Sequence, residues 1–185
     1  MPGTTIFGRM SALARELGAI NLGQGFPDAE HAPELLAAAQ RALVARPNQY
    51  PPMRGLPELR QAVCDYYARE QALALEPNEV IITSGATEAL AGALLGMLDA
   101  GDEVVVFEPM YDSYQACIAM AGARAVPVLL RPEAGVRYRF DPAELDAAIG
   151  PNTRMILLNT PHNPTGKVFD AGELVQIAEL AMDHD

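Results

Sequence analysis

Three short segments each combine an apolar run with side chains that could bind or transform a small molecule. They are "TSGATEAL" from Thr83, "EPMYDSY" from Glu108 and "NTPHNPTGKVF" from Asn159. The third contains Lys167, the only lysine in the chain. A lysine amine is a candidate nucleophile towards carbonyl compounds when its surroundings favour the neutral form.

The segment "TSGATEAL" could bind an anion. It places Gly85, Ala86 and Thr87 between a predicted strand and a predicted helix start. Backbone N–H groups are unpaired at such a start, and the helix dipole favours negative charge there. A phosphate could bind at this position, although a plain turn with a Ser/Thr cap fits the same letters.

Two aromatic side chains and an amide follow other predicted strands. Tyr111 and Tyr114 come directly after "EVVVF", and Asn163 comes after "RMILLN". Ligands of open α/β sheets bind at the carboxyl ends of the strands, where a tyrosine can stack on a flat ring. The alternatives are a tyrosine packed against its own helix and an asparagine in an ordinary turn with Pro164, which could be cis.

Two nucleotide-binding motifs are excluded. "NLGQGFPD" has Asp28 where a dinucleotide fingerprint needs a third glycine. The segment around Lys167 is not a phosphate-binding P-loop, because Pro161 replaces the first glycine and Val168 follows the lysine.

The composition restricts the partners. The 185 residues are half hydrophobic and carry a net charge of −11, so we expect a globular protein with no nucleic-acid partner. The most apolar helical run is too short for a membrane span. The three histidines are scattered, so no metal site is predicted. Cys64 and Cys117 lack CxxC spacing and no leader pattern is visible, which favours a cytoplasmic location.

The order of the elements indicates an α/β fold. Helices are predicted from Pro33 and Pro57, because apolar residues recur there at helical spacing. Further on, the apolar runs "VIITS" from Val80, "EVVVF", "RAVPVLL" and "RMILLN" read as strands, and helices are predicted over 86–98, 112–121 and 142–149. Asp141 with Glu144, and Asp170 with Glu173, should cap two helices. This alternation predicts a mainly parallel sheet with helices on both faces. Residues 1–48 are predicted to form an arm and one helix of a smaller layer.

Five motifs occur together in a characteristic order: "NLGQGFPD", "QYPPMRGLPELR", "TSGATEAL", "EPMYDSY" and "NTPHNPTGKVF". In this the chain resembles the class I pyridoxal-phosphate aminotransferases of fold type I, in the kynurenine, methionine and succinyldiaminopimelate branch. The resemblance implies an incomplete three-layer α/β/α large domain over 49–185. It also implies an N-terminal arm and small-domain portion over 1–48.

The resemblance also implies the cofactor site, for pyridoxal 5′-phosphate. Gly85, Ala86 and Thr87 would bind its phosphate, Tyr111 would stack on its ring, and Asn163 would donate to its phenolate oxygen.

Two further residues would serve the site from elsewhere. Tyr50 would reach the phosphate of the neighbouring subunit, because family members are homodimers. Gly25 would lie beside the substrate carboxylate.

The resemblance implies that the Schiff-base lysine follows residue 185, so no catalytic residue is expected in this chain. Lys167 is predicted to be a solvent-facing lysine. The predicted function is amino transfer from an L-amino acid to a 2-oxo acid. The alternatives are an inactive remnant or interaction protein and a cysteine-conjugate β-lyase. Amino acids with aromatic, sulfur-containing or dicarboxylic side chains are the expected substrates.

Overall fold

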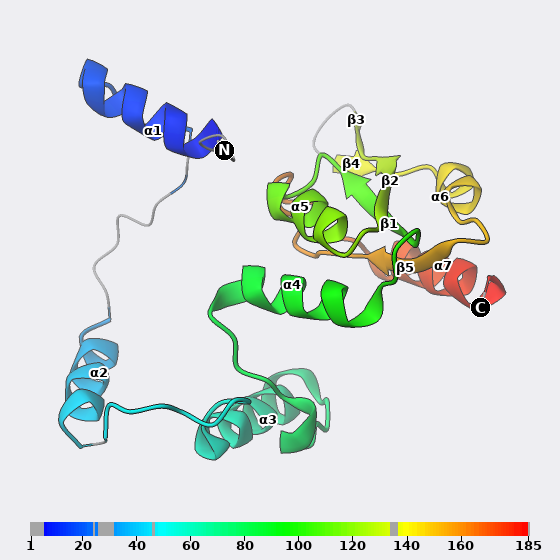
Figure 1. Cartoon of the computed structure of the whole chain (residues 1–185). Coiled ribbons are helices and arrows are strands. Elements are labelled where there is room, and N and C mark those ends of the chain that lie inside the picture. Colours follow the sequence, from blue (N-terminus) through cyan, green and yellow to red (C-terminus); the bar gives the residue numbers. More distant parts are fainter. Residues whose placement is uncertain (1–5, 24, 26–31, 46, 134–136, 185) are drawn as a thin grey trace. The chain divides into compact units, whose positions relative to one another are not determined.

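The computed structural model of the chain describes residues 6–23, 25, 32–45, 47–133 and 137–184. These residues form two compact units, which divide between Tyr50 and Pro51. Figure 1 shows the helices and strands that belong to them.

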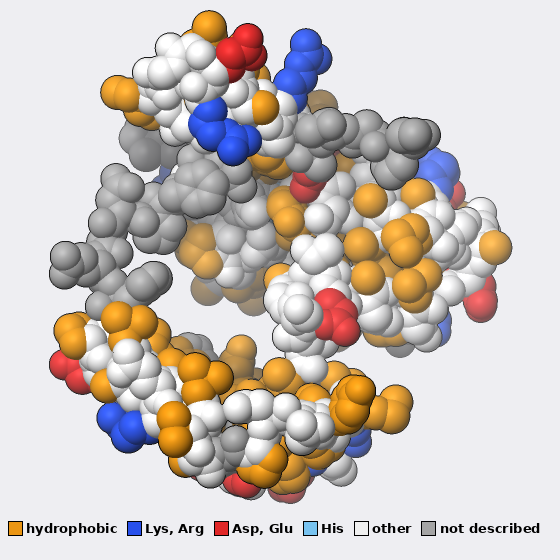
Figure 2. Space-filling view, turned by 60° about the vertical axis from the view of Figure 1, so that its left-hand side comes forward, with side chains coloured by type: hydrophobic (Ala, Val, Ile, Leu, Met, Phe, Trp, Pro, Cys, Tyr) orange, Lys and Arg blue, Asp and Glu red, His pale blue; other side chains and the backbone are white. Residues whose placement is uncertain are grey.

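The N-terminal unit contains two helices, α1 (Ile6–Leu17) and α2 (Pro33–Ala45). Only α2 was predicted, so the expectation of an arm with a single helix was wrong. Neither helix has a buried residue, although Met10, Leu13 and Leu17 recur along α1 at helical spacing. Apolar side chains are therefore exposed on this unit, and Figure 2 shows hydrophobic groups at the molecular surface.

The second unit begins with α3 (Pro57–Gln71) and the short 3₁₀ helix η1 (Pro77–Glu79). The strand predicted from Val80 does not form, so that expectation was wrong. Val80 has extended backbone angles, but the Ile82 N–H donates to the Arg54 carbonyl at 3.1 Å and not to a neighbouring strand. Gly55 makes this approach possible, because its φ is +92° and a Cβ there would collide with the Ile82 side chain.

Three predicted strands do form and make one parallel sheet. They are β1 (Glu103–Glu108), β2 (Arg124–Leu129) and β5 (Thr153–Leu157), in the order β2-β1-β5. Each pair is parallel, with Val105 opposite Val126 on one side and Ile156 on the other. Parallel strands need crossover connections, and the helices between them in the chain provide these.

Helices cover both faces of this sheet, as predicted. The helices are α4 (Gly85–Met97), α5 (Asp112–Met120), α6 (Pro142–Ala148) and α7 (Ala171–Asp183). Val104 and Val106 pack in one apolar cluster with residues of α4 and α5. Val105 and Phe107 pack in the other with residues of α6 and α7. This alternation confirms the three-layer α/β/α fold, because successive side chains of a strand point to opposite faces.

A small antiparallel hairpin was not predicted. It consists of β3 (Arg131–Glu133) and β4 (Arg137–Arg139), with Glu133 opposite Arg137 and Arg131 opposite Arg139. Its strands are three residues long and rich in arginine, so they lack the apolar alternation that identifies a strand in a sequence.

The predicted caps are present. The Asp141 carboxylate accepts from the Ala143 N–H, and Asp170 and Glu173 form a reciprocal capping box at the start of α7. These contacts satisfy N–H groups that the first helical turn leaves unpaired. Within the described part of the chain, no helix is long and apolar enough to cross a membrane.

Candidate active site

A cavity of about 650 Å³ lies in the second unit where β1 and β5 end. Ala86 and Thr87 line it from the start of α4, Tyr111 and Tyr114 from the chain after β1, and Asn159 and Asn163 from the chain after β5. Its remaining lining is apolar and consists of Ala89, Leu90, Ala93, Leu157 and Leu158. Its size is typical of small-molecule sites, and four of the predicted cofactor residues meet in it.

The start of α4 provides the anion-binding element of the cavity. Gly85, Ala86 and Thr87 are its first three residues, so no preceding helical turn accepts their N–H groups. The N–H of Ser84 donates to the Glu88 carboxylate, which fixes the entry to the helix. The N–H groups and the helix dipole together suit a phosphate.

Gly85 contributes backbone alone. It is not among the residues that line the cavity, and its φ of +82° lies in the left-handed region. In the described part of the chain, no atom lies within 4 Å of the position where a Cβ would stand. Glycine is therefore favoured here by the backbone angle and not by crowding.

Tyr111 and Tyr114 form an aromatic pair in the cavity, with ring centroids 5.7 Å apart and planes at 84°. Tyr114 is buried, whereas Tyr111 is half-buried. Burial raises the pKa of the Tyr114 hydroxyl; a hydrogen bond with the Asn159 side chain opposes this, and Tyr111 adds to it. Tyr114 was singled out in the sequence together with Tyr111, but Asn159 was not.

The loop that carries Asn163 is held by buried His162. The His162 N–H donates to the Lys167 carbonyl at 2.7 Å, and the Gly166 N–H donates to the His162 carbonyl at 2.7 Å. Its ring Nδ1 lies 2.9 Å from Thr165 Oγ1, and its side chain also bonds to the backbone of Phe107 in β1. Burial is the main reason that the pKa of His162 is lowered, because a buried site disfavours the charged ring. Sequence reasoning missed this role, because nothing in the spacing of a lone histidine identifies its partners.

Lys167 is buried, and the expectation that it faces solvent was wrong. Its side chain is 5% exposed, and Nζ lies 2.7 and 2.9 Å from the two carboxylate oxygens of Glu173. Nζ also lies 4.7 Å from the centre of the Phe169 ring. Glu173 lies in the first turn of α7, within reach of the Lys167 amine. The carboxylate therefore replaces the water that would surround the amine at the surface.

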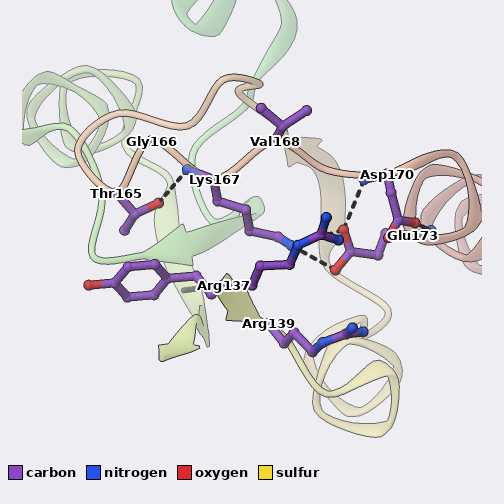
Figure 3. Close-up of a pocket in the computed structure, with 9 residues that line it drawn as sticks. Arg137, Arg139, Thr165, Gly166, Lys167, Val168, Asp170 and Glu173 are labelled. Carbon is purple, nitrogen blue, oxygen red and sulfur yellow. Dashed lines mark hydrogen bonds and ion pairs between the residues drawn. The ribbon is translucent and has the colours of Figure 1, made fainter. Parts of the chain in front are cut away.

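Lys167 does not line the cavity of Tyr111 and Asn163. It lines a separate pocket of about 360 Å³ together with Arg137, Arg139 and Asp170 (Figure 3). With its amine bound to Glu173, Lys167 is not available to a carbonyl compound in the first cavity.

The two other predicted site residues belong to the N-terminal unit. Tyr50 is 97% exposed, and no atom of the described residues lies within 4 Å of the point that a Cβ on Gly25 would occupy. Their contribution to the cavity stays a prediction. Among the described residues, no group of three His, Cys, Asp or Glu side chains could hold a metal ion.

Comparison with known proteins gives a family match over most of the chain. The family model described as aminotransferase class I and II matches residues 18–185. A probable N-succinyldiaminopimelate aminotransferase, DapC, of Mycobacterium tuberculosis is 48% identical over 97% of this chain and 45% of its own length. The methionine aminotransferase of Escherichia coli is 37% identical over 99% of this chain and 47% of its own length.

Solved structures give the same result. The N-succinyldiaminopimelate aminotransferase structure from Mycobacterium tuberculosis has a TM-score of 0.93 at 47% identity, over 98% of this chain and 47% of that one. The YbdL structure from Escherichia coli, described as a methionine aminotransferase, has a TM-score of 0.91 at 37% identity, over 100% and 48%. The chain therefore spans about half the length of the relatives that it matches.

Proposed function

Because the chain belongs to the family of class I and II aminotransferases, we propose that the protein carrying it transfers an amino group from an L-amino acid to a 2-oxo acid. Class I aminotransferases depend on pyridoxal 5′-phosphate, which supplies the electron sink for the reaction when bound. The observation that carries the proposal is the cavity in which Ala86, Thr87, Tyr111 and Asn163 meet.

The residues present suit this cofactor. The N–H groups at the start of α4 would hold its phosphate, and the Thr87 side chain lies at the same helix start. Tyr111 would cover one face of its ring. The Asn163 amide, held in place through His162, would donate a hydrogen bond to the ring oxygen.

The apolar lining contributes in a different way. Leu90, Leu157 and Leu158 would help to exclude water from the space around the ring. Charge–dipole interactions with the α4 N-terminus and the Asn163 amide are stronger in such surroundings than in water. The chain thus provides orientation, anion binding and partial exclusion of water.

The reactive amine does not come from Lys167 in this proposal. We expect the 185-residue polypeptide alone to form no covalent adduct with the cofactor, because its only lysine is bound to Glu173 outside the cavity. The polypeptide would be incubated with pyridoxal phosphate, reduced with borohydride and mapped by mass spectrometry. Stoichiometric labelling of Lys167, together with amino transfer, would overturn this assignment.

Residues 1–48 are proposed to be the arm and small-domain portion, and 49–185 part of the large domain. Tyr50, with its exposed side chain, is proposed to contact the cofactor phosphate of a second subunit in a homodimer, and Gly25 to lie near the substrate carboxylate. Light scattering of the protein that carries this chain tests the homodimer, and cofactor titration of Tyr50→Phe tests the contact of Tyr50 with the phosphate.

The activity is tested with amino donors suggested by the names of the relatives. Methionine, kynurenine and N-succinyldiaminopimelate would each be supplied with 2-oxoglutarate and pyridoxal phosphate, and glutamate formation would be measured. Glutamate formed with at least one donor, and lost without the cofactor, is the expected result. Cofactor binding without amino transfer to any 2-oxo acid would contradict the proposed reaction.

A further inference from the structure

The pocket around Lys167 is a second cavity, distinct from the candidate active site. It has a volume of about 360 Å³ and lies between β4, the loop after Thr165 and the start of α7 (Figure 3). It shares no lining residue with the cavity of Tyr111. Its size is at the lower end of the range for small-molecule sites.

The charge of this pocket is opposite in sign to that of the chain. Among the lining side chains, the positive charges of Arg137, Arg139 and Lys167 exceed the negative charges of Asp170 and Glu173 by one. Glu133, which pairs with Arg139, lies outside the lining. The whole chain carries −11. An excess of positive charge in a concave site raises the local concentration of anions.

Both carboxylates of the pocket are already engaged. Glu173 accepts from Lys167 Nζ twice and from the Asp170 N–H at 3.0 Å. Asp170 accepts from the Glu173 N–H at 3.0 Å. That bond is the main reason that the pKa of Asp170 is lowered, and Lys167 and Arg139 lower it further. Each of these acids therefore already has a hydrogen-bond donor from the chain, and Asp170 also interacts with Arg139.

The arginines are not equally occupied. Arg131, Glu133, Arg137 and Arg139 alternate along β3 and β4, so they share one face of the hairpin. Arg131 pairs with Glu144 at 2.7 Å, and Arg139 Nε pairs with Glu133 at 2.8 Å. Arg137 has no carboxylate within 4.0 Å among the residues that the structure describes. In Figure 3 its side chain extends into the pocket towards the Lys167–Glu173 pair.

We propose that this pocket binds a small oxyanion, a phosphate group or a carboxylate, between the guanidinium groups of Arg137 and Arg139. A guanidinium has five N–H donors and no acceptor, and its planar fork matches the two oxygens of such a group. Arg137 contributes donors that no carboxylate among the described residues engages, and Arg139 keeps those that Glu133 does not use. The buried Lys167–Glu173 pair lines this pocket and links the loop of Lys167 to the start of α7.

Backbone amide NMR locates the binding. Inorganic phosphate and succinate would be titrated separately into the protein at low salt, with the amides of Thr165, Gly166 and Val168 reporting on this pocket. Ala86 and Thr87 report on the other cavity, so failure of the proposed cofactor site is recognised independently. We expect saturable shifts at the first set with one or both anions, in the millimolar range, and weaker binding when salt screens the charges. The anion that binds identifies the source of the oxyanion.

Matched substitutions complete the test. Arg137→Gln should weaken binding about tenfold, because a charge-assisted hydrogen bond is lost, and Arg137→Lys should give an intermediate loss, since it keeps charge without the fork. Arg154→Gln removes an exposed arginine from β5 and should change nothing. The proposal is overturned if neither anion shifts the Thr165–Val168 amides, if shifts are confined to Ala86 and Thr87, or if Arg154→Gln weakens binding as much as Arg137→Gln.

Discussion

The ring of Tyr114 meets the ring of Tyr111 nearly at a right angle, with centroids 5.7 Å apart and planes at 84°. Both rings line the cavity, and Tyr114 is buried whereas Tyr111 is half-buried. The edge-to-face contact thus orients the ring that would stack on a cofactor, which is an arrangement that aromatic pairs favour.

Replacing Tyr111 should weaken binding of pyridoxal phosphate. Stacking contributes about 0.5–1.5 kcal/mol beyond simple burial, so Tyr111→Leu should lower the affinity by roughly two- to tenfold. Titration by absorbance measures this. Tyr66→Leu is the matched control, because Tyr66 forms a similar edge-on pair with Tyr67 on α3 and does not line the cavity. If the two variants bound the cofactor with equal affinity, Tyr111 would not be a cofactor-binding residue.

Gly85→Ala should reduce both stability and cofactor affinity. A left-handed backbone costs about 1–2 kcal/mol for a residue with a Cβ, and the φ of Gly85 is +82°. Space around the position is open, so the effect would come from a shift of the helix start. Gly92→Ala lies in the interior of the same helix, where no positive φ is present, and should stabilise the protein by about 0.5–1 kcal/mol. Urea unfolding gives the free energy of unfolding of both variants, and titration with the cofactor gives the affinity. A Gly85→Ala protein that loses stability but keeps its cofactor affinity would show that Gly85 does not contribute to cofactor binding.

Lys167→Met should destabilise the fold strongly. It leaves the Glu173 carboxylate, which is 11% exposed, without its cation, and breaking such a buried pair costs about 3–5 kcal/mol. The double variant Lys167→Met with Glu173→Leu should recover part of this loss, because no buried charge remains. As a control, Arg139→Met breaks an exposed pair with Glu133 and should cost less than about 1 kcal/mol. A Lys167→Met protein as stable as the wild type would show that the pair is not formed.

His162 predicts a pH dependence of stability. Its pKa is lowered in the folded protein, chiefly by burial, so the unfolded chain binds more protons at mildly acidic pH. The free energy of unfolding should therefore fall as the pH drops below the ordinary histidine pKa of about 6.5 towards the lower folded value. Unfolding at about pH 7.5 and about pH 5.5, on either side of that value, measures this, and His162→Gln should reduce the difference. The control His184→Gln changes an exposed histidine paired with Asp146; an equal effect there would exclude a special role for His162.

The local elements of this fold were accessible from sequence because their signals are local. Pro57 marks a helix start because its fixed φ suits the first helical turn, and Asp141 marks one because its carboxylate caps a backbone N–H. The valines of β1 identify a strand that is buried on both faces. The segment from Val80 shows the limit of that reasoning. Its composition is that of a strand, but a strand also needs a partner, and here the Ile82 N–H finds the Arg54 carbonyl.

The sequence by itself determined the family, the cofactor class and the order along the chain of helices α2 to α7 and of strands β1, β2 and β5, because motif spacing and hydrophobic period are properties of neighbouring residues. Only the tertiary structure decided what each polar group contacts. In the folded chain, Tyr111 and Asn163 line one cavity although they follow different strands. His162 is buried and contacts Thr165 of its own loop, and Lys167 binds Glu173 outside that cavity. Such contacts join residues through the packing of β1, β5 and α7, and the free energy of a buried charge depends on those neighbours and not on the lysine's place in the chain.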